Sequence, residues 1–385
     1  MPQNDRNVYI LGAGFSADAG LPLVGNFYTR LRDAYPWLSA QGRPVEMSAI
    51  EEVLQLRLDA AATGDRMVID LDNIEELFSL ASAQTGSKNV EAMCRAIAST
   101  IDYAGAVHTT PLCEILVDPN TPIPQNWVKA NPSMLASGST KLDYYCPLYE
   151  FYLGTMCGFF SNTAPIDNTI ITFNYDLLPE TGLEGLGIPF DYGIGGLKAN
   201  FEPTLPAGWG HDSSGVRLLK LHGSLNWAYP GGRGGKMRVF ENYAAVRAAQ
   251  LVPVIVPPTW RKDLDDKPLV KAWELALAAL EQATRIYVLG FSMPETDTHF
   301  RYLMAAGLQK NISLRNLTFV AKDGAQLDQR ARRFLRDTLF TNGTCKVESM
   351  TVAQLLFSPG ERNKMGRPLA DPFMRQQDTV PTWAT

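Results

Sequence analysis

Short runs of apolar residues recur along the chain and predict the strands of a buried sheet. Most of them end at a Gly, Asn or Asp and lead into a segment with helical spacing. Continuous apolar runs of this length are typical of parallel strands that are covered on both faces. The runs are Val8–Leu11, Thr169–Phe173, Leu218–Leu221, Val254–Val256, Ile286–Leu289 and Leu317–Ala321. Strands that alternate with helices predict an α/β fold with a Rossmann-like, doubly wound parallel sheet.

Between residues 45 and 160 the apolar residues change to the spacing of helices. The residues that show this spacing are Ile50, Val53, Leu54, Leu58, Ile74, Leu77, Phe78, Ala81, Val90, Met93, Cys94, Ile97 and Ile101. We therefore predict a Rossmann-like core of residues 1–44 and 161–335 with a helical insertion of residues 45–160. Residues 336–385 are predicted to be a C-terminal segment whose proline-rich end forms an extended tail.

A glycine-rich turn follows the first predicted strand and contains Gly12, Ala13, Gly14 and Ser16. Glycine lets backbone amides approach a pyrophosphate, and a helix that begins there adds positive potential. The turn also fits the dehydrogenase fingerprint, which requires an acidic residue about twenty positions further on, at the end of a second strand. Asp33 stands at that distance, but no apolar strand precedes it. The turn therefore predicts a nucleotide site. The second requirement of the dehydrogenase fingerprint, an acidic residue at the end of a second strand, is not met, so the oxidoreductase interpretation is not supported.

Polar residues at three further predicted strand ends are candidates for chemistry. Asn174 and Asp176 can face a ligand if the backbone stays extended, or they can simply end the strand in a turn. His222 stands at a strand end before a glycine, and its imidazole can take a proton from a sugar hydroxyl or from water. Gly290 and Ser292 follow another strand, where a serine can bind a phosphate or ribose or can cap a helix. Ligands of doubly wound sheets bind at such strand ends.

The charge and the cysteines narrow the class of protein. The net charge of −5 gives no electrostatic support for nucleic-acid binding, and no apolar run is long enough to span a membrane. The N-terminal residues are polar and show no signal-peptide pattern. The five cysteines form no C-x-x-C pair and no zinc motif. We therefore expect a cytoplasmic protein with reduced cysteines, no metal, and no direct contact with nucleic acid or membrane.

Taken together and in this order, the four motifs resemble the sirtuin superfamily. More closely, they resemble the SIR2-like domains of bacterial antiphage defence systems. The matching segments are Gly12–Ser16 with Gly20–Pro22, Phe173–Asp176, Lys220–Ser224 and Gly290–Ser292, and Asn73–Leu77 resembles a segment of the helical insertion in these domains. The resemblance extends from residue 8 to about residue 325.

The resemblance implies that NAD+ is bound as a substrate. The implied catalytic residues are Asn174, which places the attacking water, and His222, the general base. Asp176 lies by the nicotinamide amide, and the last predicted strand faces the adenosine half. The implied NAD+-binding residues are Gly12, Ala13, Gly14, Ser16, Pro22, Asp176, Gly290, Ser292 and Lys322.

The sequence departs from deacylating sirtuins in two places. No four-cysteine zinc module follows His222, and the Asp-Phe-Arg that usually follows the proline of the first motif is replaced by Leu23–Phe27. Without the zinc module an acyl-lysine groove is not expected. The chemistry that remains is cleavage of the nicotinamide–ribose bond by water, through an oxocarbenium-like sugar. We therefore predict an NAD+ glycohydrolase that depletes NAD+ in antiphage defence by abortive infection.

Such an activity would kill the host unless it were gated, so a homo-oligomer or a partner protein is expected to control it. The resemblance implies a HerA-type ATPase as the partner, with a short Argonaute as the alternative. Two other functions stay open: a non-catalytic sensor of NAD+ or ADP-ribose, and a protein deacylase or ADP-ribosyltransferase.

Overall fold

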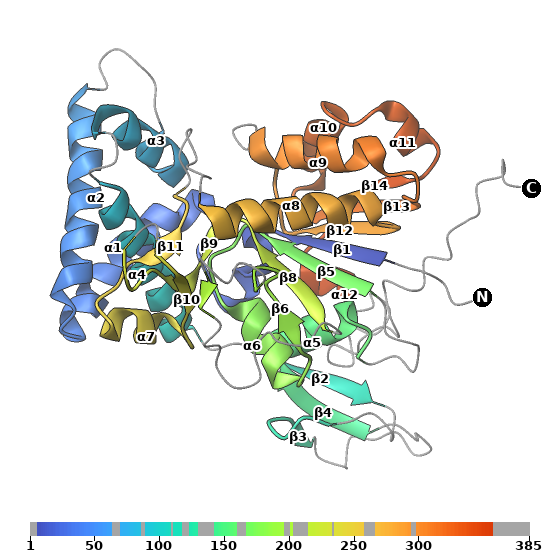
Figure 1. Ribbon diagram of the computed structural model, residues 1–385, viewed down its shortest axis with the longest axis horizontal. Coiled ribbons are helices and arrows are strands. Elements are labelled where there is room, and N and C mark those ends of the chain that lie inside the picture. The colour runs from blue at the N-terminus through green and yellow to red at the C-terminus, as the bar shows by residue number, and fades with distance from the viewer. Residues whose placement is uncertain are drawn as a thin grey trace, which may run out of the picture.

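Seven parallel strands form the central sheet, in the order β14-β13-β12-β1-β5-β8-β6 (Figure 1). They are β1 (Arg6–Leu11), β5 (Asp167–Thr172), β6 (Phe190–Asp191), β8 (Val216–Lys220), β12 (Arg285–Leu289), β13 (Asn316–Ala321) and β14 (Cys345–Ser349). The chain runs outward from β1 on one side and then returns to β12 on the other side of β1. The predicted doubly wound α/β fold is therefore confirmed, and its switch point lies between β1 and β12.

The structure is a computed structural model that describes most of the chain. The described residues are 6–63, 70–85, 89–108, 111–117, 123–129, 142–159, 167–195, 201–202, 215–232, 235–257, 266–293 and 298–356. The proline-rich tail predicted at the end of the C-terminal segment therefore lies outside the described residues. Among the described helices, none has the length and hydropathy needed to cross a lipid bilayer.

Both faces of the sheet are buried, because successive side chains of each strand point to opposite sides. In β1, Val8 and Ile10 join one apolar core, while Tyr9 and Leu11 join the other. The first core is covered by α8 (Lys267–Gln282), α9 (Thr298–Lys310) and α10 (Gly324–Arg332), which lie above the sheet in Figure 1. The second is covered by α5 (Leu148–Met156), α6 (Leu178–Gly185) and α12 (Val352–Leu356).

A helical layer stands beside the sheet (Figure 1), and all but its first helix lie where the spacing between residues 45 and 160 predicted helices. Its helices are α1 (Phe27–Ala40), α2 (Pro44–Thr63), α3 (Ile74–Thr85) and α4 (Val90–Val107). α4 is buried on most sides because it contacts α1, α2 and a second, four-stranded sheet. That sheet has the order β11-β9-β10-β7 and consists of β7 (Phe201–Glu202), β9 (Gly223–Ala228), β10 (Met237–Val239) and β11 (Pro253–Ile255), with α7 (Tyr243–Ala248) against β9.

Three features differ from the sequence prediction. The apolar run at Val254–Val256 forms β11, which pairs antiparallel with β9 and does not join the central sheet. Residues 45–160 contain a three-stranded sheet of β2 (Leu112–Val117), β4 (Leu142–Pro147) and β3 (Val128–Lys129) as well as helices. The central sheet continues past residue 335, because β14 adds an edge strand there, followed by α12; the short helix α11 (Asp337–Thr341) precedes β14. A short apolar run does not encode which strand it will pair with.

Candidate active site

One cavity of about 460 Å³ opens at the carboxyl ends of β1, β5, β12 and β13, next to the switch point. Its volume lies within the usual range for small-molecule sites. The structure brings all eleven residues that the sequence singled out to the wall of this cavity. They are Gly12, Ala13, Gly14, Ser16, Pro22, Asn174, Asp176, His222, Gly290, Ser292 and Lys322. Their roles toward a ligand stay predictions.

The two glycine turns at the ends of β1 and β12 pack directly on each other. The Gly14 N–H donates to the Gly290 carbonyl at 2.8 Å, and the Gly12 N–H donates to the Leu289 carbonyl at 3.0 Å. Gly290 has a φ of 65°, and a Cβ there would lie 2.2 Å from the Phe15 nitrogen. The turns therefore require glycine for their mutual approach, whatever ligand they meet.

The predicted helix at this turn is wrong. Residues Ala13–Phe15 and Ala17–Ala19 form two single 3-10 turns, a third spans Val24–Asn26, and α1 begins only at Phe27. Positively charged potential from a long helix axis is therefore not available at Gly12 and Gly14. Any binding of a phosphate at this turn must come from its own backbone amides and from side chains such as Ser16.

Gly290→Ala is expected to lower the free energy of unfolding by at least about 2 kcal/mol, because alanine is strained at positive φ and its Cβ meets the Phe15 backbone. Urea unfolding followed by circular dichroism measures this loss. Gly25→Ala is the matched control, since a Cβ at Gly25 meets nothing within 4 Å. The control should change stability by less than about 0.5 kcal/mol. Equal effects of the two substitutions would contradict the tight packing of the two turns.

Hydrogen bonds fix the Asn174 side chain in an orientation in which its amide oxygen faces the cavity. Its Nδ2 donates to the Gly12 carbonyl at 2.9 Å and to the Ser16 Oγ at 3.0 Å. A backbone carbonyl can only accept, so the nitrogen must lie on this side and Oδ1 on the other. Among the described residues, Oδ1 has no hydrogen-bond donor, and it is not sealed from the cavity. A water or a ligand hydroxyl in the cavity can donate to it.

Asp176 orients the Ser16 side chain through a hydrogen bond. The Ser16 hydroxyl donates to Asp176 Oδ2 at 2.8 Å, and the Leu178 N–H donates to Oδ1 at 3.0 Å. Each carboxylate oxygen therefore already accepts a hydrogen bond from the protein, and the side chain is 5% exposed. The bonds from Asn174 to Ser16 and from Ser16 to Asp176 join the ends of β1 and β5. Asp176 is thus a positioning residue in this structure, and the nicotinamide contact implied by the resemblance stays a prediction.

A buried ion pair supports this strand end. Lys220 and Glu180 are both fully buried, and Lys220 Nζ donates to Glu180 Oε1 at 2.8 Å and also to the backbone carbonyl of Asp176. The Tyr192 hydroxyl donates to the same Oε1 at 3.0 Å, while Oε2 of Glu180 has no hydrogen-bond partner among the residues that the structure describes. Burial raises the pKa of Glu180, and the charge of Lys220 opposes that rise. Lys220 thus fixes the backbone that carries Asp176.

His222 is held among aromatic rings at the turn between β8 and β9. Its ring meets Phe173 edge-on at 5.0 Å and lies 6.4 Å from the rings of Tyr175 and Trp273. The Val256 N–H donates to its carbonyl at 2.9 Å, and the ring is nearly buried while it lines the cavity. Gly223, which follows it, has a φ of 87° and lies too close to the Val254 carbonyl for any side chain. This packing restricts the position of the imidazole ring at the cavity wall.

Sequence reasoning missed the far wall of the cavity. Ile74 and Glu75 of α3, Ile97 and Ile101 of α4, and Met350–Val352 face it. Only Asn73–Leu77 carried a signal, as one of the matching segments. The apolar residues of α4 have the same spacing as core residues, so the sequence could not separate a cavity wall from a packed interior.

Two further groups of side chains shape the cavity. Arg330 of α10 donates to the Ser292 carbonyl at 2.6 Å and to Gln326 Oε1, and both α10 residues line the cavity. On the other side, the Tyr149 hydroxyl of α5 donates to the Phe15 carbonyl at 2.9 Å and accepts from the Ala19 N–H. Burial raises the pKa of Tyr149, so the hydroxyl keeps its proton. The aromatic segment around α5 therefore holds the first turn in place.

The described residues contain no cluster of three or more His, Cys, Asp or Glu side chains that could hold a metal ion. The five cysteines are free thiols, and the Sγ atoms of Cys113 and Cys146 lie 3.3 Å apart across β2 and β4.

Comparison with known proteins gives distant likenesses. No protein-family model and no curated protein matches the chain. A solved structure of Sir2 with the inhibitor EX-527, 2'-O-acetyl-ADP-ribose and deacetylated p53 peptide is similar over 90% of this chain and 88% of that one, with 14% identity and a TM-score of 0.34. Sir2 with p53 peptide and NAD+ gives the same coverage and identity with a TM-score of 0.32. Sir2Tm bound to a propionylated peptide covers 88% of this chain and 93% of its own, with 13% identity and a TM-score of 0.32. The chain is thus similar to sirtuin structures along most of its length, at TM-scores too low for any residue's role to be transferred.

Proposed function

We propose that this chain binds NAD+ and hydrolyses the bond between nicotinamide and ribose. The observation that carries the proposal is the position of Asn174 and His222 in one cavity at the switch point of the sheet. Asn174 leaves its amide oxygen to the cavity, and the two glycine turns form another part of the cavity wall. The order and spacing of the sirtuin-like motifs in the sequence support NAD+ as the ligand.

The residues suit a reaction in which the leaving group departs first. The nicotinamide ring of NAD+ is positively charged and departs as neutral nicotinamide without being protonated, so the protein needs no carboxylate pair of the kind that glycosidases use. Asn174 Oδ1 accepts a hydrogen bond from the attacking water and orients it, and His222 takes the proton of that water. The apolar wall from α3 and α4 excludes bulk solvent. General-base catalysis of this kind contributes about 10²–10⁴-fold in rate.

Uncontrolled NAD+ loss would kill the cell, so the proposed activity requires regulation. We propose that the activity serves antiphage defence in the cytoplasm and is gated by oligomerisation or by a partner, a HerA-type ATPase before a short Argonaute. The missing four-cysteine zinc module favours water over an acyl-lysine as the acceptor.

The proposal is tested by incubating the purified protein with NAD+, alone and with the product of the adjacent gene, and by separating nicotinamide from ADP-ribose. His222→Ala is expected to lower the rate about 10²-fold, near the lower end for loss of a general base, because bond cleavage precedes proton transfer. His299→Ala is the matched control, since His299 of α9 does not line the cavity.

The outcomes of this experiment separate the functions. Release of both products by the wild type and its loss in His222→Ala support the hydrolase. Tight NAD+ or ADP-ribose binding without turnover under every activating condition would replace it with a sensor. A mass shift of an acylated peptide, in step with NAD+ consumption, would replace it with a deacylase.

A further inference from the structure

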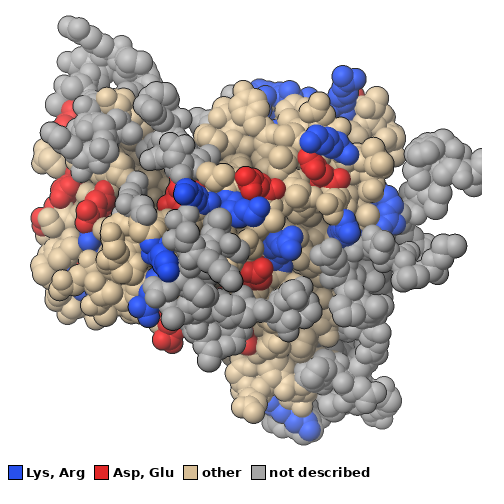
Figure 2. Space-filling view, in the orientation of Figure 1, with Lys and Arg blue, Asp and Glu red and all other residues tan. Residues whose placement is uncertain are grey.

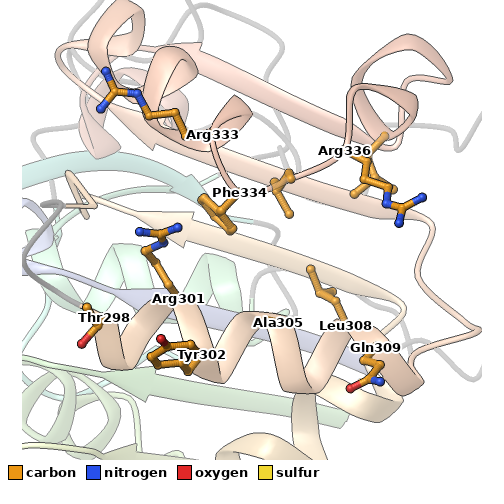
Figure 3. Close-up of a pocket in the computed structure, with 11 residues that line it drawn as sticks. Thr298, Arg301, Tyr302, Ala305, Leu308, Gln309, Arg333, Phe334 and Arg336 are labelled. Atoms are coloured by element: carbon orange, nitrogen blue, oxygen red, sulfur yellow. The ribbon is translucent and has the colours of Figure 1, made fainter.

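A second cavity, of about 610 Å³, lies between α9 and the segment Arg333–Leu339. Figure 3 shows Arg301 rising from α9 toward Phe334 of the facing segment, with Arg333 and Arg336 on the two sides of Phe334. We call this cavity the α9 groove. Its apolar lining consists of Ala305, Leu308, Phe334, Leu335 and Leu339. The groove thus combines an apolar floor with an arginine rim.

The charge of the α9 groove runs against that of the whole chain. Its eleven described lining residues include three arginines and no carboxylate, while the chain carries a net charge of −5. Neither Arg301 nor Arg336 makes an ion pair within the described part of the chain. Tyr302, on the same helix, is 73% exposed. Such a surface favours a partner that presents carboxylates beside apolar side chains.

The outer face of α2 offers that chemistry on the same molecule. Glu52, Gln55 and Asp59 are exposed at helical spacing, and neighbouring Leu58 is 60% exposed. Figure 2 shows Asp and Glu side chains gathered at the left edge, over the helical layer that contains α2, and several Lys and Arg side chains over α9 to α11. α2 has 20 residues, about 30 Å in length, and is longer than the 13-residue helix α9 that forms one side of the groove.

We propose that copies of this chain join head to tail, with α2 of one copy seated in the α9 groove of the next. The two surfaces lie at opposite sides of the molecule (Figure 1), so each copy can use both at once. Two different surfaces in contact make a heterologous interface, which closes into a ring or extends as a filament. The proposal concerns assembly and does not depend on the proposed activity.

Both surfaces adjoin walls of the candidate active site. α2 packs against α3 and α4, which contribute Ile74 and Ile97 to the cavity. The groove segment continues directly from α10, which contributes Gln326 and Arg330. Head-to-tail contact therefore involves elements that adjoin the cavity at both ends. Assembly can change the geometry of the site through these elements.

The proposal is tested by light scattering coupled to size exclusion on the full-length chain. The wild type is expected to be larger than a monomer, and added salt should shift it toward the monomer because charges drive the contact. A groove variant, Arg301→Glu with Arg336→Glu, and a helix variant, Glu52→Lys with Asp59→Lys, are each expected to be monomeric. Mixed together, they should assemble again. The original helix of one variant fits the original groove of the other, and the reversed groove and the reversed helix also carry opposite charges.

The control variant Lys129→Glu with Arg217→Glu reverses two exposed charges elsewhere and should keep the wild-type mass. A variant that carries all four groove and helix changes should assemble again, which also shows that the changes leave the fold intact. A monomeric wild type would overturn the proposal, and so would assembly that survives either the groove or the helix variant. None of these outcomes depends on NAD+ turnover, so failure here leaves the proposed function untouched.

Discussion

Lys220→Met is expected to lower the free energy of unfolding by about 3–5 kcal/mol, the usual cost of leaving one partner of a buried ion pair alone. Methionine matches the length of the lysine stem but leaves Glu180 without its cation and the Asp176 carbonyl without a donor. Urea unfolding at neutral pH measures the loss. Lys271→Met is the matched control, because Lys271 pairs with Glu274 at an exposed position. An exposed pair contributes at most about 1 kcal/mol.

The pH dependence of this variant identifies the cause. Burial raises the pKa of Glu180, and loss of Lys220 removes the charge that opposes the rise. A carboxyl whose pKa is higher in the folded state contributes stability below its unfolded pKa and loses it as the pH rises through the folded pKa. The deficit of Lys220→Met should therefore be largest at neutral pH and shrink in acid. Adding Glu180→Gln should recover part of the stability at neutral pH. A deficit that stays constant with pH would assign the loss to packing alone.

Under the proposed mechanism, Asn174→Ala is expected to lower the rate of NAD+ cleavage about 10³-fold, since it removes both the proposed acceptor for the attacking water and the donor that holds Ser16. Nicotinamide release under saturating NAD+ measures the effect. Asn311→Ala is the matched control, because the Asn311 Nδ2 also donates to two protein oxygens, the carbonyls of Leu280 and Ala283, and lies away from the cavity. The two variants should lose similar stability, and only the first should lose activity.

A second measurement keeps this prediction independent of folding. NAD+ binding by calorimetry should persist in Asn174→Ala at reduced affinity, because the glycine turns still pack on each other without the side chain. Equal activity losses in the two asparagine variants would assign the effect to general destabilisation and would remove Asn174 from the mechanism.

The site could be predicted from the sequence where chemistry and strand ends coincide. Gly12, Asn174, His222 and Gly290 each follow an apolar run, and parallel strands bring such ends to one edge of the sheet. The sheet order itself could not be predicted, because Val254–Val256 looks like the other runs and yet pairs with β9.

The residues that hold the site in place were harder to predict from the sequence. Glu180 and Lys220 are 40 positions apart, and no local pattern indicates that two opposite charges will be buried together. A lysine at the end of an apolar run was the only cue, since lysine is rarely fully buried without a partner. The 3-10 turns after Gly12 were missed for a different reason: Tyr149 of α5, at least 130 positions away, holds the backbone of this turn.

The order in which the ribosome makes the chain bears on the candidate site. The cavity is bounded by Gly12 near one end and by Val352 near the other, and β1 receives its neighbour β12 only after more than 270 intervening residues. Contacts of such long sequence separation form late and slowly. A nascent chain therefore has no closed cavity until Val352 has left the ribosome. If the chain does cleave NAD+, incomplete products of translation are harmless to the cell that makes them.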